Sequence, residues 1–144
     1  MILYLDSSAI VKLYIAEPHA DLVRQALRES VASCTHLIAY AEVRAGLAKA
    51  LRQRRETPEG LILHKRELDE AWERFRVVLP TEGQIRRAAD LAERFGLRGY
   101  DSVHLAAAES VRDGLGSGVD FRFAGFDDAL VRAAEGLGFG LISA

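Results

Sequence analysis

The sequence predicts an α/β fold in which a mainly parallel central sheet of about five short strands is flanked by helices. Short apolar runs rich in strand-forming residues alternate along the chain with segments whose apolar residues recur at helical spacing. Ser, Thr, Asp, Pro and Gly stand at most of the junctions. The chain has 144 residues, 49% of them hydrophobic, which suits one domain with its own core. We therefore expect a single domain over residues 1–144.

Each element is predicted from its local pattern. The strands are expected at residues 2–5, 31–34, 76–79, 121–126 and 139–142. The helices are expected over residues 9–15, 22–27, 36–52, 58–75, 82–95, 100–111 and 128–137. Thr35 is expected to cap the long helix after the second strand. Pro58 follows Thr57 at a first helical position, where its missing N–H costs nothing, and this helix should complete a hairpin near 35–75.

Composition and charge argue against several classes of protein. The formal net charge of −2 does not suit a protein that coats a nucleic-acid duplex by bulk positive charge, although it allows local contact. No apolar stretch approaches the roughly 18 residues of a membrane helix, and Asp6 interrupts the first apolar run too early for a signal peptide. The single cysteine, Cys34, predicts neither an internal disulfide nor a zinc site. We therefore expect a cytoplasmic protein.

Two aspartates are expected at the carboxyl edge of the sheet, where ligands bind in parallel α/β folds. Asp6 directly follows the first strand, and Asp127 follows the strand over 121–126. Each has a second interpretation, because Asp is also a good helix N-cap that stabilises a helix by about 1 kcal/mol. Asp128 stands beside Asp127 as a competing cap.

Two further carboxylates lie on predicted helix faces that are otherwise small or apolar. The neighbours of Glu42 three and four positions away are Ile38, Ala39, Ala45 and Gly46. Asp101 begins a helix that is similarly rich in Ala, Val and Leu. A carboxylate in such surroundings is costly unless it is paired, protonated or bound to a cation. The alternatives are a boundary glutamate that reaches solvent and a first-turn aspartate favoured by the helix dipole.

The four acids Asp6, Glu42, Asp101 and Asp127 together predict one shared site. Like charges that converge cannot all stay ionised without a counter-ion. Mg²⁺ or Mn²⁺ is the natural one, because hard divalent cations prefer carboxylate and water oxygens. We therefore expect a divalent-cation site at the carboxyl edge.

Four segments carry a more specific pattern: DSSAIVKLY at 6–14, AEVR at 41–44, YDSVHLAAA at 100–108 and FD at 126–127. In this order, and over essentially the whole chain, they resemble the PIN-domain ribonucleases and in particular the VapC toxins of toxin–antitoxin pairs. The resemblance implies a PIN-like (Rossmann-like) fold. The family often has Thr or Ser two positions before its fourth acid, where this chain has Gly125, so Asp128 or Asp120 is the alternative to Asp127.

The resemblance also implies a metal-dependent endoribonuclease that acts as a toxin and leaves a 3′-hydroxyl on the cut RNA. Asp6 and Asp101 would be the principal ligands of Mg²⁺ or Mn²⁺, and Glu42 and Asp127 would complete the catalytic pocket directly or through water. Ser8 would orient a metal-bound water. One or two cations would polarise the scissile phosphate and supply the nucleophile.

The implied partners are a small antitoxin, which would insert a basic side chain into the acidic pocket, and a second copy of the chain. Trp72 and Phe75 are candidates for a homodimer interface, with the core as the alternative. Arginines are the candidates for holding RNA, because guanidinium groups match phosphate oxygens. They are Arg44, Arg86, Arg87, Arg98 and the group Arg52, Arg54 and Arg55, with solvated helix charge as the alternative.

Two other functions fit parts of the pattern. A phosphohydrolase would use Asp6 as a covalent nucleophile, but the second residue after it is Ser8 rather than another aspartate. A non-catalytic module of the same fold would bind RNA or an assembly partner without a metal, although all four expected acids are present.

His104, one helical turn from Asp101, is a candidate for proton transfer, with a packed residue as the alternative.

Overall fold

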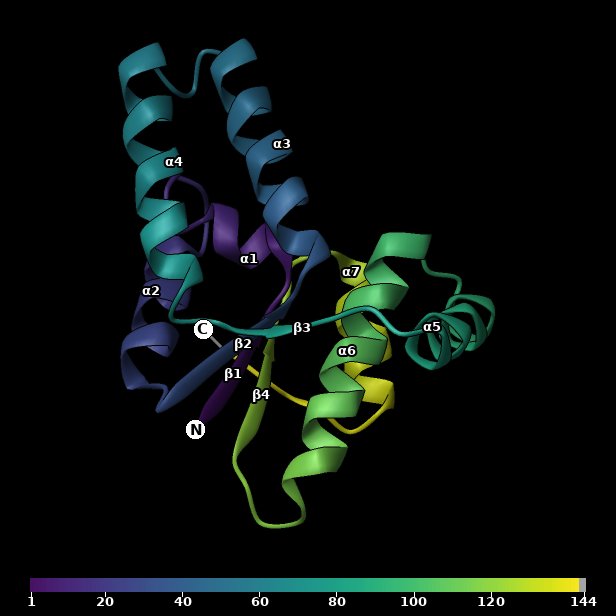
Figure 1. The fold of residues 1–144 in the computed structure, drawn as a ribbon. Coiled ribbons are helices and arrows are strands. Elements are labelled where there is room, and N and C mark those ends of the chain that lie inside the picture. Colours follow the sequence, from purple (N-terminus) through teal and green to yellow (C-terminus); the bar gives the residue numbers. More distant parts are fainter. Residues whose placement is uncertain (143–144) are drawn as a thin grey trace.

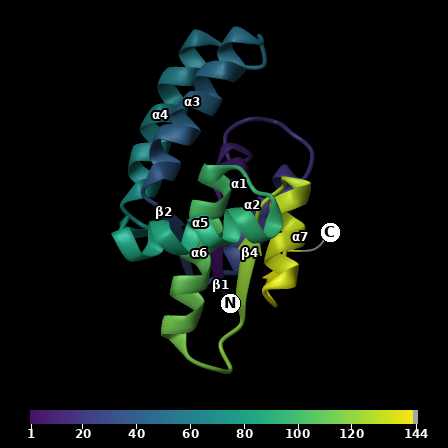
Figure 2. The ribbon, with the colours of Figure 1, turned by 90° about the vertical axis from the view of Figure 1, so that its right-hand side faces the viewer.

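Helices cover both faces of a five-stranded parallel sheet, so the protein is a three-layer sandwich (Figures 1 and 2). The computed structural model describes residues 1–142. The strands are β1 (Ile2–Leu5), β2 (Ala32–His36), β3 (Arg76–Val78), β4 (Phe121–Ala124) and β5 (Gly140–Leu141), in the order β3-β2-β1-β4-β5. The helices are α1 (Ser7–Val11), α2 (Ala20–Glu29), α3 (Ile38–Arg52), α4 (Pro58–Trp72), α5 (Glu82–Phe95), α6 (Gly99–Leu115) and α7 (Asp128–Gly136). The predicted fold class is confirmed, including the hairpin, which α3 and α4 form.

The central strand β1 shows why the apolar run at the start of the chain becomes a buried strand. Leu3 and Leu5 point into a core that β1 shares with α1, α2, α3 and α4. Tyr4, between them, points into a second core on the other face, under α5, α6 and α7. A parallel strand buried on both faces is apolar at consecutive positions rather than at alternate ones. Within residues 1–142, no helix has the length and apolar content needed to cross a bilayer.

The prediction that Thr35 caps the long helix is wrong, because β2 continues through Thr35 to His36. The Thr35 hydroxyl donates to the carbonyl of Leu5 at 2.7 Å and is therefore used inside the sheet. The ring of His36 serves the start of α3 instead, because its Nδ1 accepts the backbone N–H of Ile38 at 3.0 Å. The other corrections concern the bounds of elements. The first helix ends at Val11 rather than at residue 15, β4 ends at Ala124 rather than at 126, and α6 continues to Leu115 rather than ending at 111.

An ion pair between α5 and α6 gives a test of what holds this side of the sandwich together. Two hydrogen bonds of 2.7 and 2.8 Å join the Arg87 guanidinium to the Glu109 carboxylate and lower the pKa of Glu109. Because the Arg87 side chain is 42% exposed, we predict that Glu109→Gln lowers the free energy of unfolding by only about 0.5–1 kcal/mol at neutral pH. A carboxyl group with a lowered pKa stabilises above its unfolded pKa and loses that effect as the pH falls through the folded value.

Urea unfolding of wild type and Glu109→Gln at neutral and acid pH measures this difference, which should disappear in acid. The matched control is Glu82→Gln, because Glu82 pairs with Arg86 on the same helix α5 but both side chains are largely exposed. This control should unfold like the wild type at both pH values. An equal loss of stability for Glu109→Gln at both pH values would contradict a role for the carboxylate charge.

Candidate functional site at the acidic edge

The four predicted acids, Asp6, Glu42, Asp101 and Asp127, come from the end of the sheet at which α1, α3, α6 and α7 begin (Figure 1). Asp6 follows β1, and Asp127 lies between β4 and α7. Asp101 is in the first turn of α6, and Glu42 is in α3. Burial raises the pKa of Asp6 and of Asp101, and the charge of a neighbouring acid adds to each shift, Asp101 for Asp6 and Asp127 for Asp101. We call these four residues the acidic edge.

Asp6 uses only one of its two carboxylate oxygens as a helix cap. It is the N-cap of α1, where its Oδ1 accepts the Ala9 backbone N–H at 2.8 Å and the Ser8 hydroxyl at 2.7 Å. Its Oδ2 has no hydrogen bond within residues 1–142 and faces Gly125, where an added Cβ would lie 3.0 Å away. Burial, with 3% of the residue exposed, raises the pKa of Asp6. In this structure Ser8 therefore orients Asp6 itself.

Asp127 divides its oxygens in the same way. Its Oδ1 accepts the Leu130 backbone N–H at 3.1 Å as the N-cap of α7, and its Oδ2 accepts Nη2 of Arg98 at 3.4 Å. Nε of the same Arg98 donates to Oδ2 of Asp101 at 3.0 Å. Arg98 thus bridges two acids of the edge while 60% of its side chain stays exposed. Burial raises the pKa of Asp101, and the contact with Arg98 opposes this effect.

The two alternatives to Asp127 lie elsewhere. Asp128 is exposed in the first turn of α7. Asp120 precedes β4, at the opposite end of the sheet, and accepts Nε of Arg122 at 3.0 Å. The placement therefore favours Asp127 as the fourth acid.

Glu42 is held by a histidine of α6, the helix that covers the other face of the sheet. Nε2 of His104 in α6 lies 2.7 Å from Oε1 of Glu42, and Nδ1 of His104 lies 2.9 Å from the hydroxyl of Tyr4 in β1. Burial raises the pKa of Tyr4 well above its ordinary value, so this hydroxyl keeps its proton. His104 is thus a packed residue, and Tyr4 was missed as part of the site. The available signal was a phenol hydroxyl inside a fully buried strand, because buried polar groups need partners.

Of the arginines predicted to bind RNA, Arg98 lies at the acidic edge and several others already have partners. Arg44 donates to the Tyr40 hydroxyl at 3.1 Å. Arg87 pairs with Glu109, and Arg55 pairs with Glu17 at 3.0 Å. Arg86 pairs with Glu82, and Arg52 and Arg54 are exposed on the distal part of the hairpin. The two aromatic residues predicted for a homodimer interface belong to the core instead. Phe75 is buried in it, and Trp72 packs against it and meets the Phe75 ring edge-on.

The acidic edge has the donors of a hard-cation site, with Arg98 between two of them. Asp6, Glu42, Asp101 and Asp127 offer only carboxylate oxygens, the ligands that Mg²⁺ and Mn²⁺ prefer. Within residues 1–142, no three His, Cys, Asp or Glu side chains already surround a point that could hold a metal ion. The guanidinium that bridges Asp101 and Asp127 shows that this position accepts positive charge.

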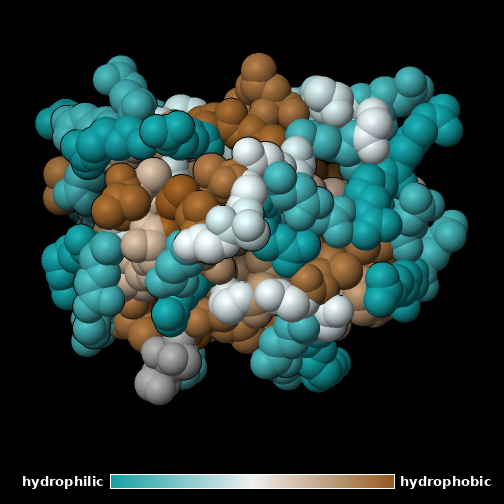
Figure 3. Space-filling model, turned by 90° about the horizontal axis from the view of Figure 1, so that it is seen from below, coloured by the Kyte–Doolittle hydropathy of each residue, from teal (hydrophilic) through white to brown (hydrophobic). Residues whose placement is uncertain are grey.

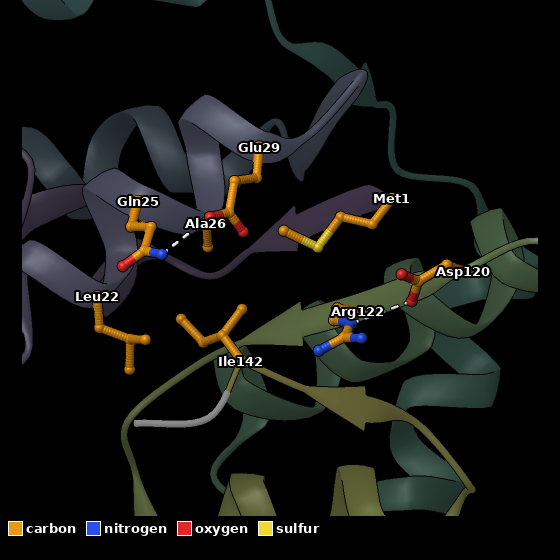
Figure 4. Close-up of a pocket in the computed structure, with 8 residues that line it drawn as sticks. All are labelled: Met1, Leu22, Gln25, Ala26, Glu29, Asp120, Arg122 and Ile142. Carbon is orange, nitrogen blue, oxygen red and sulfur yellow. Dashed lines mark hydrogen bonds and ion pairs between the residues drawn. The ribbon is translucent and has the colours of Figure 1, made fainter.

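The opposite, amino-terminal edge of the sheet has a different character. Apolar side chains are interspersed with hydrophilic ones on this face (Figure 3), and Val31, just before β2, is 83% exposed. A cavity of about 290 Å³ opens here, lined in part by Met1 and Arg122 (Figure 4). Its two carboxylates already have partners, because Glu29 accepts from Gln25 and Asp120 from Arg122. This cavity therefore has two paired carboxylates, whereas four gather at the other edge.

The fold and the site define a class of protein: a parallel α/β domain whose strand ends and helix starts gather carboxylates at one edge. A family model for the PIN domain matches residues 3–133, and the chain belongs to the PIN domain family.

Named relatives agree with this assignment. The chain is 37% identical over 112 residues to Ribonuclease VapC49 of Mycobacterium tuberculosis (strain ATCC 25618 / H37Rv), which covers 78% of each chain. It is 32% identical over 141 residues to Ribonuclease VapC46 of the same strain, covering 98% of this chain and 96% of the relative. A solved toxin–antitoxin complex from Klebsiella pneumoniae contains the same fold, with a TM-score of 0.65, 16% identity and coverage of 98% and 96% of the two chains.

Proposed function

We propose that this protein is a divalent-cation-dependent endoribonuclease and the toxin of a toxin–antitoxin pair. The observation that carries the proposal is the acidic edge, where Asp6 and Asp127 each direct one oxygen away from a helix cap and Arg98 supplies the positive charge between two acids. The RNA substrate is supported by relatives that are named ribonucleases and that match this chain over most of their length. We further propose that residues 1–144 act as one PIN domain.

Asp6, Glu42, Asp101 and Asp127 would hold the cation, Mg²⁺ or Mn²⁺. When bound, this cation supplies the charge that polarises a phosphodiester and makes an attacking water more acidic. Asp6 is fixed for this role, because Ser8 and the start of α1 hold its other oxygen. Arg98, released from Asp101 and Asp127, would bind a phosphate oxygen of the RNA, which a guanidinium matches well.

The partners follow from the same charges. An antitoxin that places a basic side chain between Asp101 and Asp127 would reproduce the contact that Arg98 makes and would block the site. A homodimer is also proposed, with α4 contributing because Ile62 and Leu63 are exposed on its outer face. Trp72 and Phe75 are committed to the core and would not form the centre of such an interface. We place the protein in the cytoplasm, where RNA and antitoxin are available.

Cleavage of RNA by the purified protein tests the proposal directly. We predict cleavage in Mg²⁺ or Mn²⁺, complete loss in excess EDTA, and recovery when the divalent ion is restored, with a 3′-hydroxyl on the upstream product. Asp101→Asn, purified in the same way, controls for contaminating nucleases. Cleavage that persists in EDTA would contradict the proposed cation dependence. The absence of both cleavage and Mn²⁺ binding would favour the non-catalytic module instead.

A further inference from the structure

We propose that His104 is a positioning residue that holds the Glu42 carboxylate at the acidic edge, through a hydrogen-bonded chain anchored on Tyr4 in the core. The inference rests on the proposed function and adds to it a part of the site that the four acids do not include. We call the three residues the Tyr4–His104–Glu42 chain.

The Tyr4–His104–Glu42 chain joins residues of three elements and runs from the acidic edge into the interior. His104 on α6 is 1% exposed, whereas the Glu42 side chain on α3 is 20% exposed. The Nε2–Oε1 distance between them is 2.7 Å, and the distance from His104 Nδ1 to the Tyr4 hydroxyl on β1 is 2.9 Å. Both ring nitrogens are therefore within hydrogen-bonding distance of protein groups.

The partners also determine which ring nitrogen carries the hydrogen. An ionised carboxylate only accepts hydrogen bonds, so the bond to Glu42 requires the hydrogen on Nε2. A neutral imidazole then has its lone pair on Nδ1, and the Tyr4 hydroxyl donates to it. The Glu42 carboxylate thus fixes the tautomer of His104, and Tyr4 supplies a donor for the ring nitrogen that carries no hydrogen.

Aromatic neighbours restrict the orientation of the His104 ring. The Tyr4 ring meets it edge-on, at 6.0 Å between centroids and 74° between planes. The His36 ring does the same, at 6.4 Å and 77°. His36 is itself fixed, because its Nδ1 accepts the Ile38 backbone N–H. The imidazole therefore has a defined direction in which it presents its N–H.

Glu42 needs this support more than the aspartates do. Asp6 and Asp127 are fixed by the helices that they cap. Glu42 lies within α3 and caps no helix, and its side chain has one more rotatable bond than that of an aspartate. A long carboxylate side chain samples several rotamers unless a partner restrains it. Displacement of a ligand group by about 1 Å can cost on the order of 100-fold in rate. The hydrogen bond from His104 restricts the rotamers of Glu42.

Two substitutions at His104 separate positioning from packing. His104→Leu fills the site without a donor, and His104→Gln restores an N–H that can reach Glu42. For the leucine variant we expect a loss of about 10- to 100-fold in kcat with little change in KM for RNA, and a weaker affinity for Mn²⁺ alone by about tenfold in calorimetry. The glutamine variant should recover part of both. Tyr4→Phe should shift both quantities in the same direction as leucine, by less.

The matched control is Phe123→Leu. The Phe123 ring stacks on the Tyr4 ring, with 5.6 Å between centroids and 5° between planes, but has no part in the hydrogen bonds of Tyr4, His104 and Glu42. This variant should lose stability and keep its kcat and its Mn²⁺ affinity. If His104→Leu, folded at the assay temperature, matches the wild type in kcat and Mn²⁺ affinity, the proposal is overturned.

Ring ¹⁵N chemical shifts of His104 in the wild-type protein give a second readout that needs neither RNA nor metal. We expect the Nε2–H tautomer, and finding the hydrogen on Nδ1 instead would overturn the proposal even if the leucine variant does not fold. A wild-type protein that neither binds Mn²⁺ nor cleaves RNA would refute the proposed function, while the tautomer would still decide whether the hydrogen-bonded chain exists.

Discussion

Asp6→Asn is expected to reduce RNA cleavage by about 10³-fold or more while leaving the domain folded, because a metal-bound carboxylate contributes several kcal/mol to stabilising the transition state. Asparagine is as good a helix N-cap as aspartate, so α1 keeps its start. Burial already disfavours the charged form of Asp6, as its raised pKa indicates, so a neutral residue there should not lower stability. Cleavage rates, together with thermal unfolding in EDTA and in Mn²⁺, measure the two effects separately.

Asp128→Asn is the matched control for this prediction. It makes the same change at an exposed acid in the first turn of α7, next to Asp127, and should cleave RNA like the wild type. Mn²⁺ should raise the unfolding temperature of the wild type and of Asp128→Asn, but not that of Asp6→Asn. Retained cleavage by Asp6→Asn would rule out Asp6 as a principal ligand.

Arg98→Ala is expected to change metal binding and RNA cleavage in opposite directions. Without the guanidinium, Asp101 and Asp127 lose a competing cation, so the Kd for Mn²⁺ should fall by about two- to fivefold. Cleavage should decrease by about tenfold or more, because a charged hydrogen bond to the RNA phosphate is lost. Calorimetry with Mn²⁺ alone and kcat/KM for RNA give the two quantities.

Arg98→Lys keeps the charge and removes the guanidinium fork, and so separates the two effects. It should bind Mn²⁺ nearly as the wild type does and still cleave RNA more slowly, since an ammonium does not bridge two oxygens in the same way. Weaker Mn²⁺ binding by Arg98→Ala would mean that Arg98 supports the acids rather than competing for them.

Much of the fold could be predicted because local sequence and tertiary environment agree at most elements. β1 consists of large hydrophobic side chains with one phenol hydroxyl, as suits a strand covered on both faces, and Thr57 with Pro58 begins α4 as expected. The end of β2 could not be predicted, because it depends on contacts distant in sequence. The Thr35 hydroxyl bonds to the carbonyl of Leu5, and a histidine ring caps α3 in place of the expected threonine.

The acidic edge was predictable to the extent that strand ends indicate it. Asp6 and Asp127 follow strands, and helical spacing places Glu42 and Asp101 among apolar neighbours. The partners of these acids were not predictable, because His104 is 62 positions from Glu42 and 100 positions from Tyr4. Arg98, a candidate for holding RNA, contacts Asp101 three positions away and Asp127 29 positions away. The second contact was not predictable, because it joins the start of α6 to the residue before α7.

The two helix-capping aspartates have an evolutionary consequence. In Asp6 and Asp127 one oxygen maintains the fold and the other is directed to the site, so a change to asparagine affects only the second of these roles. Such a change needs a single nucleotide in the codon. A lineage could therefore lose cleavage in one step and still inherit a folded domain with an unchanged outer surface. Partner binding could then persist under selection after catalysis is gone, which makes a non-catalytic descendant readily accessible from an active nuclease of this fold.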